Sequence, residues 1–217
     1  ATKAVTTRGY DSGFRAFLVF MLEQRIQQHF IDSADLKYQA APLLGKPLAD
    51  AVHALVACVT SGGKMLACGN GPSAASAQQF AAFCVAGFER ERPELAALAL
   101  SVDGALLTSG AGVDSTQQFA RQVRALGQAG DVLLLVCVTG NDANLLSAVA
   151  AAHEREMVVV ALTGRAAGAL AGLLRETDIL ISVPHERAAR VREVHALVLN
   201  CLCDGIDSQL FGEQENP

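Results

Sequence analysis

The sequence predicts an α/β fold with a doubly wound, five-stranded parallel sheet, N-terminal helices and a long C-terminal helix. Five short apolar runs support this prediction, together with the glycine-, serine- or asparagine-containing turns that follow most of them. The runs are uninterrupted, which is typical of strands buried on both faces of a sheet. They cover residues 64–68, 95–100, 131–138, 157–162 and 178–183. Strands that alternate with helices form parallel sheets, and ligands bind outside the carboxyl ends of such strands.

Helical periodicity surrounds the five runs. Apolar residues recur at helical spacing over 21–38 and again over 47–60, where Ser61-Gly62-Gly63 provides a stop. The last helix is expected over 186–211. We expect residues 1–20 to be a leader that precedes a natural start at Met21. Residues 21–217 are then expected to form a single domain with a helical extension at about 21–62.

Composition and charge limit the classes of function that the chain can have. The chain has 217 residues, is 51% hydrophobic and carries a formal net charge of −5, which argues against direct binding of nucleic acid. Its six cysteines lie in apolar segments without a CxxC pair, so we expect buried, reduced thiols. Because no run approaches about 18 apolar residues, we expect no membrane span and a soluble, cytoplasmic protein. We also expect no cofactor.

The turn after the first apolar run has the features of an anion site. Gly69 and Gly71 allow a sharp turn, and Pro72 suits the first position of a helix. The helix dipole and the Ser73 hydroxyl then favour a negatively charged group. One alternative is a tight turn without a ligand. Another is a dinucleotide site, because Gly69-x-Gly71-x-x-Ala74 nearly matches that fingerprint, but no acidic residue is well placed about 20 positions later.

Several segments together resemble the SIS family of sugar-isomerase domains. They are Gly69-Asn70-Gly71-x-Ser73, Thr139-Gly140-Asn141, Val160-Ala161-Leu162-Thr163-Gly164 and Arg190-Val191-Arg192-Glu193-Val194-His195. The resemblance covers about residues 21–211, and the most similar groups are the phosphoheptose isomerases and the DnaA initiator-associating proteins. It implies a homotetramer and a phosphosugar site, formed here by Asn70, Ser73, Asp103, Thr139, Asn141 and Asp142.

The chain departs from the isomerases at four positions. The isomerases place a His and a Glu on one helix and a Gln and a His on another around a metal. The matching residues here are Gln79, Phe83, Arg192 and Asn200. An amide does not titrate near neutral pH, a phenyl ring has no lone pair to offer, and a guanidinium repels a cation. We therefore expect no metal.

Glu193 and His195 match the family and are the candidates for proton transfer. At i, i+2 on a helix the two side chains do not share a face, and the alternative is a structural role for His195 at a subunit contact. Arg187 and Arg190 either form a solvated face or contact an anion. For Asp142 we hypothesise that its carboxylate partly occupies the anion site, since it replaces a hydroxyl at a helix N-terminus.

Leu210 and Phe211 end the last helix. They resemble the apolar pair with which the initiator-associating proteins contact their partner, although such a pair can also pack within its own chain. From these departures we expect a non-catalytic SIS oligomer that binds the replication initiator DnaA and promotes its assembly at the origin. The alternatives are a phosphoheptose isomerase, which converts sedoheptulose 7-phosphate to heptose 7-phosphate, and a sugar-phosphate sensor without turnover.

Overall fold

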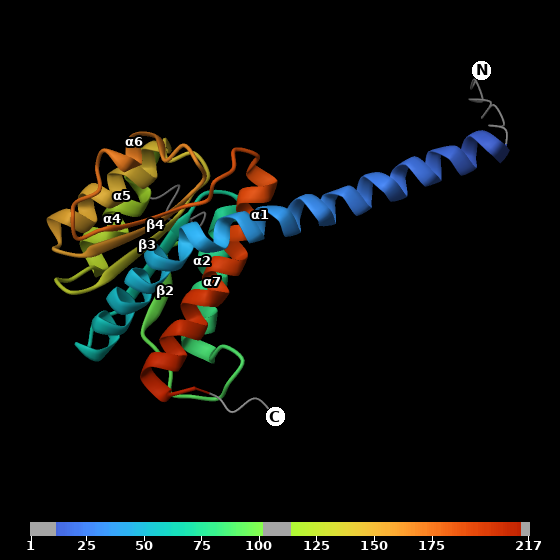
Figure 1. Ribbon diagram of the computed structural model, residues 1–217. Coiled ribbons are helices and arrows are strands. Elements are labelled where there is room, and N and C mark those ends of the chain that lie inside the picture. Colours follow the sequence, from blue (N-terminus) through green and yellow to red (C-terminus); the bar gives the residue numbers. More distant parts are fainter. Residues whose placement is uncertain (1–11, 102–113, 214–217) are drawn as a thin grey trace, which may run out of the picture.

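The computed structural model describes residues 12–101 and 114–213, and its centre is a five-stranded, all-parallel sheet (Figure 1). The strands lie in the order β2-β1-β3-β4-β5. Their bounds are β1 Met65–Gly69, β2 Ala97–Ala99, β3 Val132–Val136, β4 Val158–Thr163 and β5 Ile179–Ser182. The predicted fold class is confirmed. Because the chain places β2 on one side of β1 and β3 on the other, the strand order reverses between β1 and β3.

Helices cover both faces of this sheet. Their bounds are α1 Ser12–Thr60, α2 Pro72–Ala86, η1 Ser115–Gln117, α4 Gln118–Leu126, α5 Ala143–Glu154, α6 Gly168–Ala171 and α7 Ala188–Phe211. Alternate residues of the strands point to opposite faces. Met65 and Leu134 pack in the cluster that contains buried residues of α1, α2 and α7, whereas Leu66 and Leu133 pack with α4 and α5. This alternation produces the two-sided burial that the uninterrupted apolar runs predict.

The N-terminal region is one helix, so the prediction of separate helices over 21–38 and 47–60 is wrong. Pro42 and Pro47 both lie inside α1. The helix continues because a buried stripe at spacings of three, four and seven residues crosses both prolines: Leu36, Ala40, Leu44, Ala51, Leu55 and Cys58. The part of α1 before this stripe extends well beyond the body of the domain (Figure 1).

One expectation from composition needs correction, and the expectation of no membrane span meets one candidate helix. Five cysteines are buried and all six are free, but Cys201 is exposed on α7. The segment Phe17–Thr60 within α1 is long and apolar enough to cross a membrane. An 18-residue window within it has a mean hydropathy of 1.3, and 28% of that window is buried inside the protein. Length and composition alone do not assign this helix to a membrane, since core helices of soluble proteins pass the same test.

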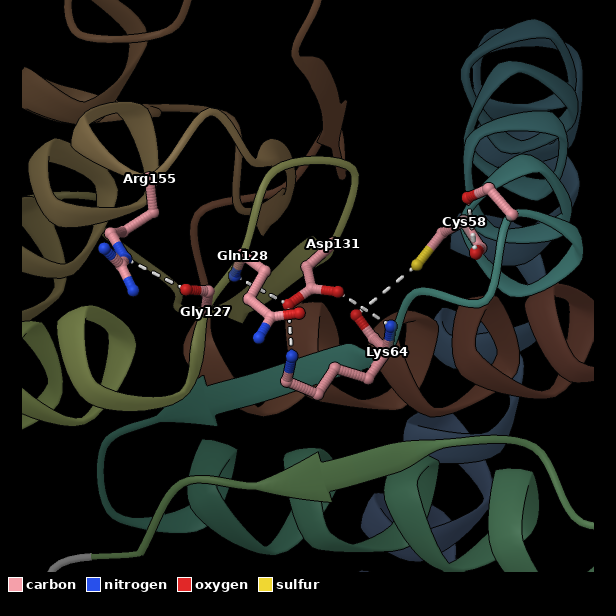
Figure 2. Close-up of polar contacts among 7 residues, drawn as sticks. Cys58, Lys64, Gly127, Gln128, Asp131 and Arg155 are labelled. Atoms are coloured by element: carbon pink, nitrogen blue, oxygen red, sulfur yellow. Dashed lines mark hydrogen bonds and ion pairs between the residues drawn. The ribbon is translucent and has the colours of Figure 1, made fainter.

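A buried carboxylate fixes the amino end of the sheet, opposite the candidate site (Figure 2). Asp131 is 1% exposed and accepts hydrogen bonds from the backbone N–H of Lys64 at 2.9 Å and of Gln128 at 2.8 Å. Its other contact is an ion pair with Lys64 Nζ at 2.6 Å. Because Lys64 precedes β1 and Asp131 precedes β3, these contacts align the starts of the two central strands.

Candidate functional site

The carboxyl ends of the central strands meet at one edge of the sheet. Gly69 at the end of β1 pairs with Val136 of β3, and Val136 pairs with Leu162 of β4. The turns that follow these strands therefore lie side by side, and the reversal of strand order falls between β1 and β3. In open α/β sheets this position forms the ligand-binding crevice.

The turn after β1 has the backbone geometry that the sequence predicts. A Cβ atom at Gly69 would lie 2.7 Å from the carbonyl oxygen of Ser73 and 2.8 Å from that of Val136, so only glycine fits there. Gly71 has a φ of 53°, and Pro72 begins α2. The N–H of buried Ser73 donates to the carbonyl of Asn70 at 3.0 Å. This amide is thus already bonded within the turn, which reduces the number of donors open to an anion.

The side chain of Asn70 forms a reciprocal amide pair with Asn144. Asn70 Nδ2 donates to Asn144 Oδ1 at 2.9 Å, and Asn144 Nδ2 donates to Asn70 Oδ1 at 2.9 Å. Asn144 lies in the first turn of α5, directly after the β3 turn. Sequence reasoning missed Asn144. The only signal was a second asparagine three positions after Asn141, and its partner 74 residues away becomes apparent only in the fold.

The turn after β3 packs tightly against the loop before α6. Gly140 has a φ of 67°, and a Cβ there would lie 1.9 Å from the carbonyl oxygen of Ala167. Asn141 Oδ1 accepts the N–H of Ala169 at 2.9 Å, so this side chain supports the loop. Thr139 is exposed at the same turn. Asp103, the remaining acidic candidate, lies outside the described residues.

Asp142 is the N-cap residue of α5. Its backbone carbonyl accepts hydrogen bonds from the N–H groups of Leu145 and Leu146, both at 3.0 Å. Its carboxylate makes no side-chain cap bond to that helix within the described part of the chain. The hypothesis that this carboxylate occupies the anion site stays a prediction.

Nearby Cys137 is buried, which raises the pKa of its thiol to about 11. A thiol with this pKa stays protonated and offers no anionic group to the turn.

The turn after β4 is connected to α7 through His195. The imidazole is fully buried, and its Nε2 atom lies 3.1 Å from the carbonyl oxygen of Thr163, so that nitrogen carries the proton and donates. Burial lowers the pKa of His195 to about 4, against the opposing effect of this hydrogen bond. The ring is therefore neutral at pH 7. Within residues 12–101 and 114–213, neither His195 Nδ1 nor Thr163 Oγ1 has a hydrogen-bond partner.

Glu193 faces a different neighbourhood from His195, as the i, i+2 spacing predicts. It pairs with Arg190, whose other terminal nitrogen contacts His29 Nδ1 of α1. Burial pushes the pKa of Glu193 upward, but hydrogen bonds from Ser33 and Arg190 outweigh this effect and leave it below the ordinary value. Glu193 is thus an ionised carboxylate at the junction of α1 and α7. Arg190 is 5% exposed, whereas Arg187 is exposed beside the same surface hollow.

The four positions that correspond to the family's metal set do not fit a metal. Gln79 is exposed, and the Phe83 ring packs edge-to-face against Phe88 with centroids 5.1 Å apart. Arg192 carries a positive charge, and Asn200 Oδ1 is a neutral oxygen that is buried without a partner in the described residues. In that same part of the chain, no group of three or more His, Cys, Asp or Glu residues could hold a metal ion.

Leu210 and Phe211 are half-buried and pack against the core cluster of α1, α2 and α7. Arg90 holds this end of α7, with its guanidinium 5.6 Å from the centroid of the Phe211 ring and a hydrogen bond of 2.8 Å to the carbonyl of Gly212. Close by, buried Arg92 forms an ion pair with Asp207 at 2.8 Å. The apolar pair therefore has packing partners within its own chain, as in the alternative that the sequence left open.

Comparison with known proteins agrees with the geometry. The SIS domain family matches residues 29–164. A phosphoheptose isomerase of Methylibium petroleiphilum is 59% identical over 196 residues, which cover 90% of this chain and 98% of the relative. A phosphoheptose isomerase of an Azoarcus species is 52% identical over 89% of this chain and 99% of its own length. The solved structure of a phosphoheptose isomerase from Neisseria gonorrhoeae superposes with a TM-score of 0.80 at 46% identity, and covers 86% of this chain and 99% of that one.

These relatives overturn the functional prediction from the sequence. A non-catalytic scaffold for the replication initiator was expected because the four metal-set positions are replaced. The relatives that match along nearly their whole length are instead named phosphoheptose isomerases. The prediction of an initiator-binding scaffold is therefore wrong, and the phosphosugar alternative replaces it.

Proposed function

Because the chain belongs to the SIS domain family, we propose that it is a phosphosugar isomerase of the phosphoheptose isomerase type. Its reaction is the interconversion of sedoheptulose 7-phosphate, a ketose, with heptose 7-phosphate, an aldose. The observation that carries the proposal is the 59% identity to a protein of that name over 98% of its length. The match extends over 196 of the 217 residues.

The sugar phosphate is expected outside the carboxyl ends of β1 and β3. The turn after β1 supplies Asn70 and the start of α2, and the turn after β3 supplies Thr139 and the start of α5. Two helix N-termini directed at one crevice favour an anion such as a phosphate ester. We assign the contacts to the phosphosugar to Asn70, Ser73, Thr139, Asn141, Asp142 and Asp103.

Isomerisation moves a proton between neighbouring carbons and therefore needs a base. Of the two candidates for proton transfer, Glu193 and His195, Glu193 is the carboxylate, and its pKa lies below the ordinary value. A surface hollow of about 520 Å³ adjoins it. We propose Glu193 as the base. His195 is neutral and donates to Thr163, so we give it the role of holding the β4 turn.

A sugar-phosphate sensor without turnover is the second candidate. It is favoured by the residues at the metal-set positions, where Phe83 and Arg192 can neither bind a cation nor transfer a proton at neutral pH. The sensor keeps the phosphosugar site of the first proposal and lacks only the chemistry. The two candidates therefore differ in turnover and agree in binding.

One experiment separates these candidates. The purified chain is incubated with sedoheptulose 7-phosphate, aldose formation is followed by NMR, and binding is measured in parallel by calorimetry. Turnover that Glu193→Gln abolishes, and that Glu176→Gln at an exposed position retains, supports the isomerase and its base. Binding without turnover supports the sensor. If the chain neither binds nor converts the sugar phosphate, both candidates fail.

We further propose that the protein is a cytoplasmic homotetramer that binds no nucleic acid. The support for an assembly is the exposed apolar surface of α1 before the buried stripe, where nine large side chains are 48–74% exposed: Phe17, Leu18, Val19, Phe20, Met21, Leu22, Ile26, Phe30 and Ile31. A patch of this kind marks a protein contact. Light scattering should give a tetramer for the intact chain and a smaller species for Phe30→Glu. A monomeric intact chain would refute the assembly.

A further inference from the structure

The Asn70–Asn144 pair lies at the reversal of strand order. Asn70 follows β1, Asn144 follows the β3 turn, and β1 and β3 are the neighbours between which the reversal occurs. Each side chain donates one hydrogen bond of 2.9 Å to the other. The pair therefore bridges the two strand ends at the position where ligands bind in this class of sheet.

Reciprocal pairing fixes the orientation of each amide relative to the other. A primary amide has two N–H donors and an oxygen with two lone pairs, and each amide here uses one donor and one lone pair on its partner. A 180° flip of one side chain alone would place N–H against N–H and oxygen against oxygen. Asn144 thus couples the orientation of the Asn70 amide to its own, since neither side chain can flip alone, and each amide keeps one N–H and one lone pair for another group.

The backbone around Asn70 is fixed as well. The carbonyl of Asn70 accepts the N–H of Ser73 at 3.0 Å, and Gly69 packs directly against the carbonyl oxygens of Ser73 and Val136. With the main chain fixed by the turn and the side chain fixed by Asn144, Asn70 is held in one arrangement before any ligand arrives. Such preorganisation raises affinity because less freedom is lost on binding.

We propose that Asn144 is a positioning residue, which holds the Asn70 amide so that its free N–H and free lone pair meet a hydroxyl group of the bound sugar phosphate. A hydroxyl both donates and accepts, so it matches the two open valences of the amide. Asn144 acts through Asn70, while the phosphate end of the ligand is bound by the helix N-termini. This inference rests on the proposed sugar-phosphate site.

A double-mutant cycle tests the inference. Binding of sedoheptulose 7-phosphate and of inorganic phosphate is measured by calorimetry for the intact chain, Asn70→Ala, Asn144→Ala and the double variant. Ser147→Ala is the matched control, since it removes a hydrogen bond to Gln117 of 3.2 Å from the same helix without affecting the turn. We expect Asn144→Ala to weaken the sugar phosphate about five- to tenfold, the loss of one oriented hydrogen bond.

Other results of the cycle distinguish positioning from a structural role. The double variant should bind the sugar phosphate no more than about twofold less tightly than Asn70→Ala, because residues that act through one another are not additive. Inorganic phosphate, which lacks the sugar hydroxyls, should bind all variants alike. Unchanged sugar-phosphate binding in Asn144→Ala, fully additive losses, or an equal loss of inorganic phosphate would overturn the inference. If the intact chain binds no sugar phosphate, the proposed function falls together with it.

Discussion

Removal of the Asp131 carboxylate should destabilise the fold by about 2–4 kcal/mol. In Asp131→Ala the backbone N–H groups of Lys64 and Gln128 lose their acceptor, and an unsatisfied buried donor costs about 1–3 kcal/mol each. The lower part of the summed range is expected, because water can enter the space that the carboxylate leaves. The measurement is urea denaturation at pH 7 and fixed protomer concentration, since assembly would contribute to stability.

Lys64→Met is the matched control for this prediction. It removes the ammonium at 2.6 Å but leaves the backbone N–H of residue 64, so the carboxylate keeps two of its three hydrogen bonds. The Lys64 side chain is 31% exposed and that of Asp131 is 2% exposed. Because water reaches the ammonium group and two backbone N–H groups still bind the carboxylate, we expect Lys64→Met to cost only about 1 kcal/mol. If Lys64→Met destabilised the protein as much as Asp131→Ala, the charge pair would dominate, and the argument from buried backbone donors would be refuted.

Three further predictions concern the site and its turns. The folded-state pKa of His195, about 4, lies below the ordinary 6.5, so the neutral imidazole contributes its full stability above pH 6.5 and this stability is lost as the pH falls toward 4. Urea denaturation should show this loss in the intact chain and a flatter dependence of stability on pH in His195→Gln. Equal pH dependence in the two proteins would contradict the prediction. Gly140→Ala should cost more than about 2 kcal/mol, because its Cβ would overlap the carbonyl of Ala167, whereas Gly130→Ala, with a φ of 86° and open space, should cost about 1 kcal/mol in the same assay. If turnover is found, EDTA should leave its rate unchanged, since the metal-set positions carry no suitable ligands; a chelator-sensitive rate that zinc restores would refute this.

The sheet could be predicted from the sequence because each of its strands is locally marked. An uninterrupted apolar run with a glycine-rich turn after it, as in 64–68 followed by Gly69 to Ser73, defines both a buried strand and its carboxyl end. Each observed strand lies inside its predicted run or extends at most one residue beyond it. The position of the site followed from the same information, because parallel strands bring their carboxyl ends to one edge.

The rest depended on contacts that no local pattern contains. Pro42 and Pro47 normally interrupt a helix, but the stripe from Leu36 to Cys58 packs on α7 and β5 and outweighs their cost. The Asn70–Asn144 pair joins positions 74 residues apart. The functional prediction failed for a different reason: it rested on four replaced positions, whereas the similarity to the isomerases extends over 90% of the chain.

The two prolines inside α1 divide that helix into two parts with different protection of the backbone. Pro42 and Pro47 lack the N–H groups that would bond the carbonyls of Tyr38 and Leu43, both of which are exposed residues that water can reach. The later part, 47–60, packs against the core, whereas 17–31 is mainly exposed. Amide hydrogen exchange should therefore be slow over 47–60 at any dilution. Over 17–31 it should become faster as the protein is diluted, because there only contacts with other subunits can retain the helical hydrogen bonds.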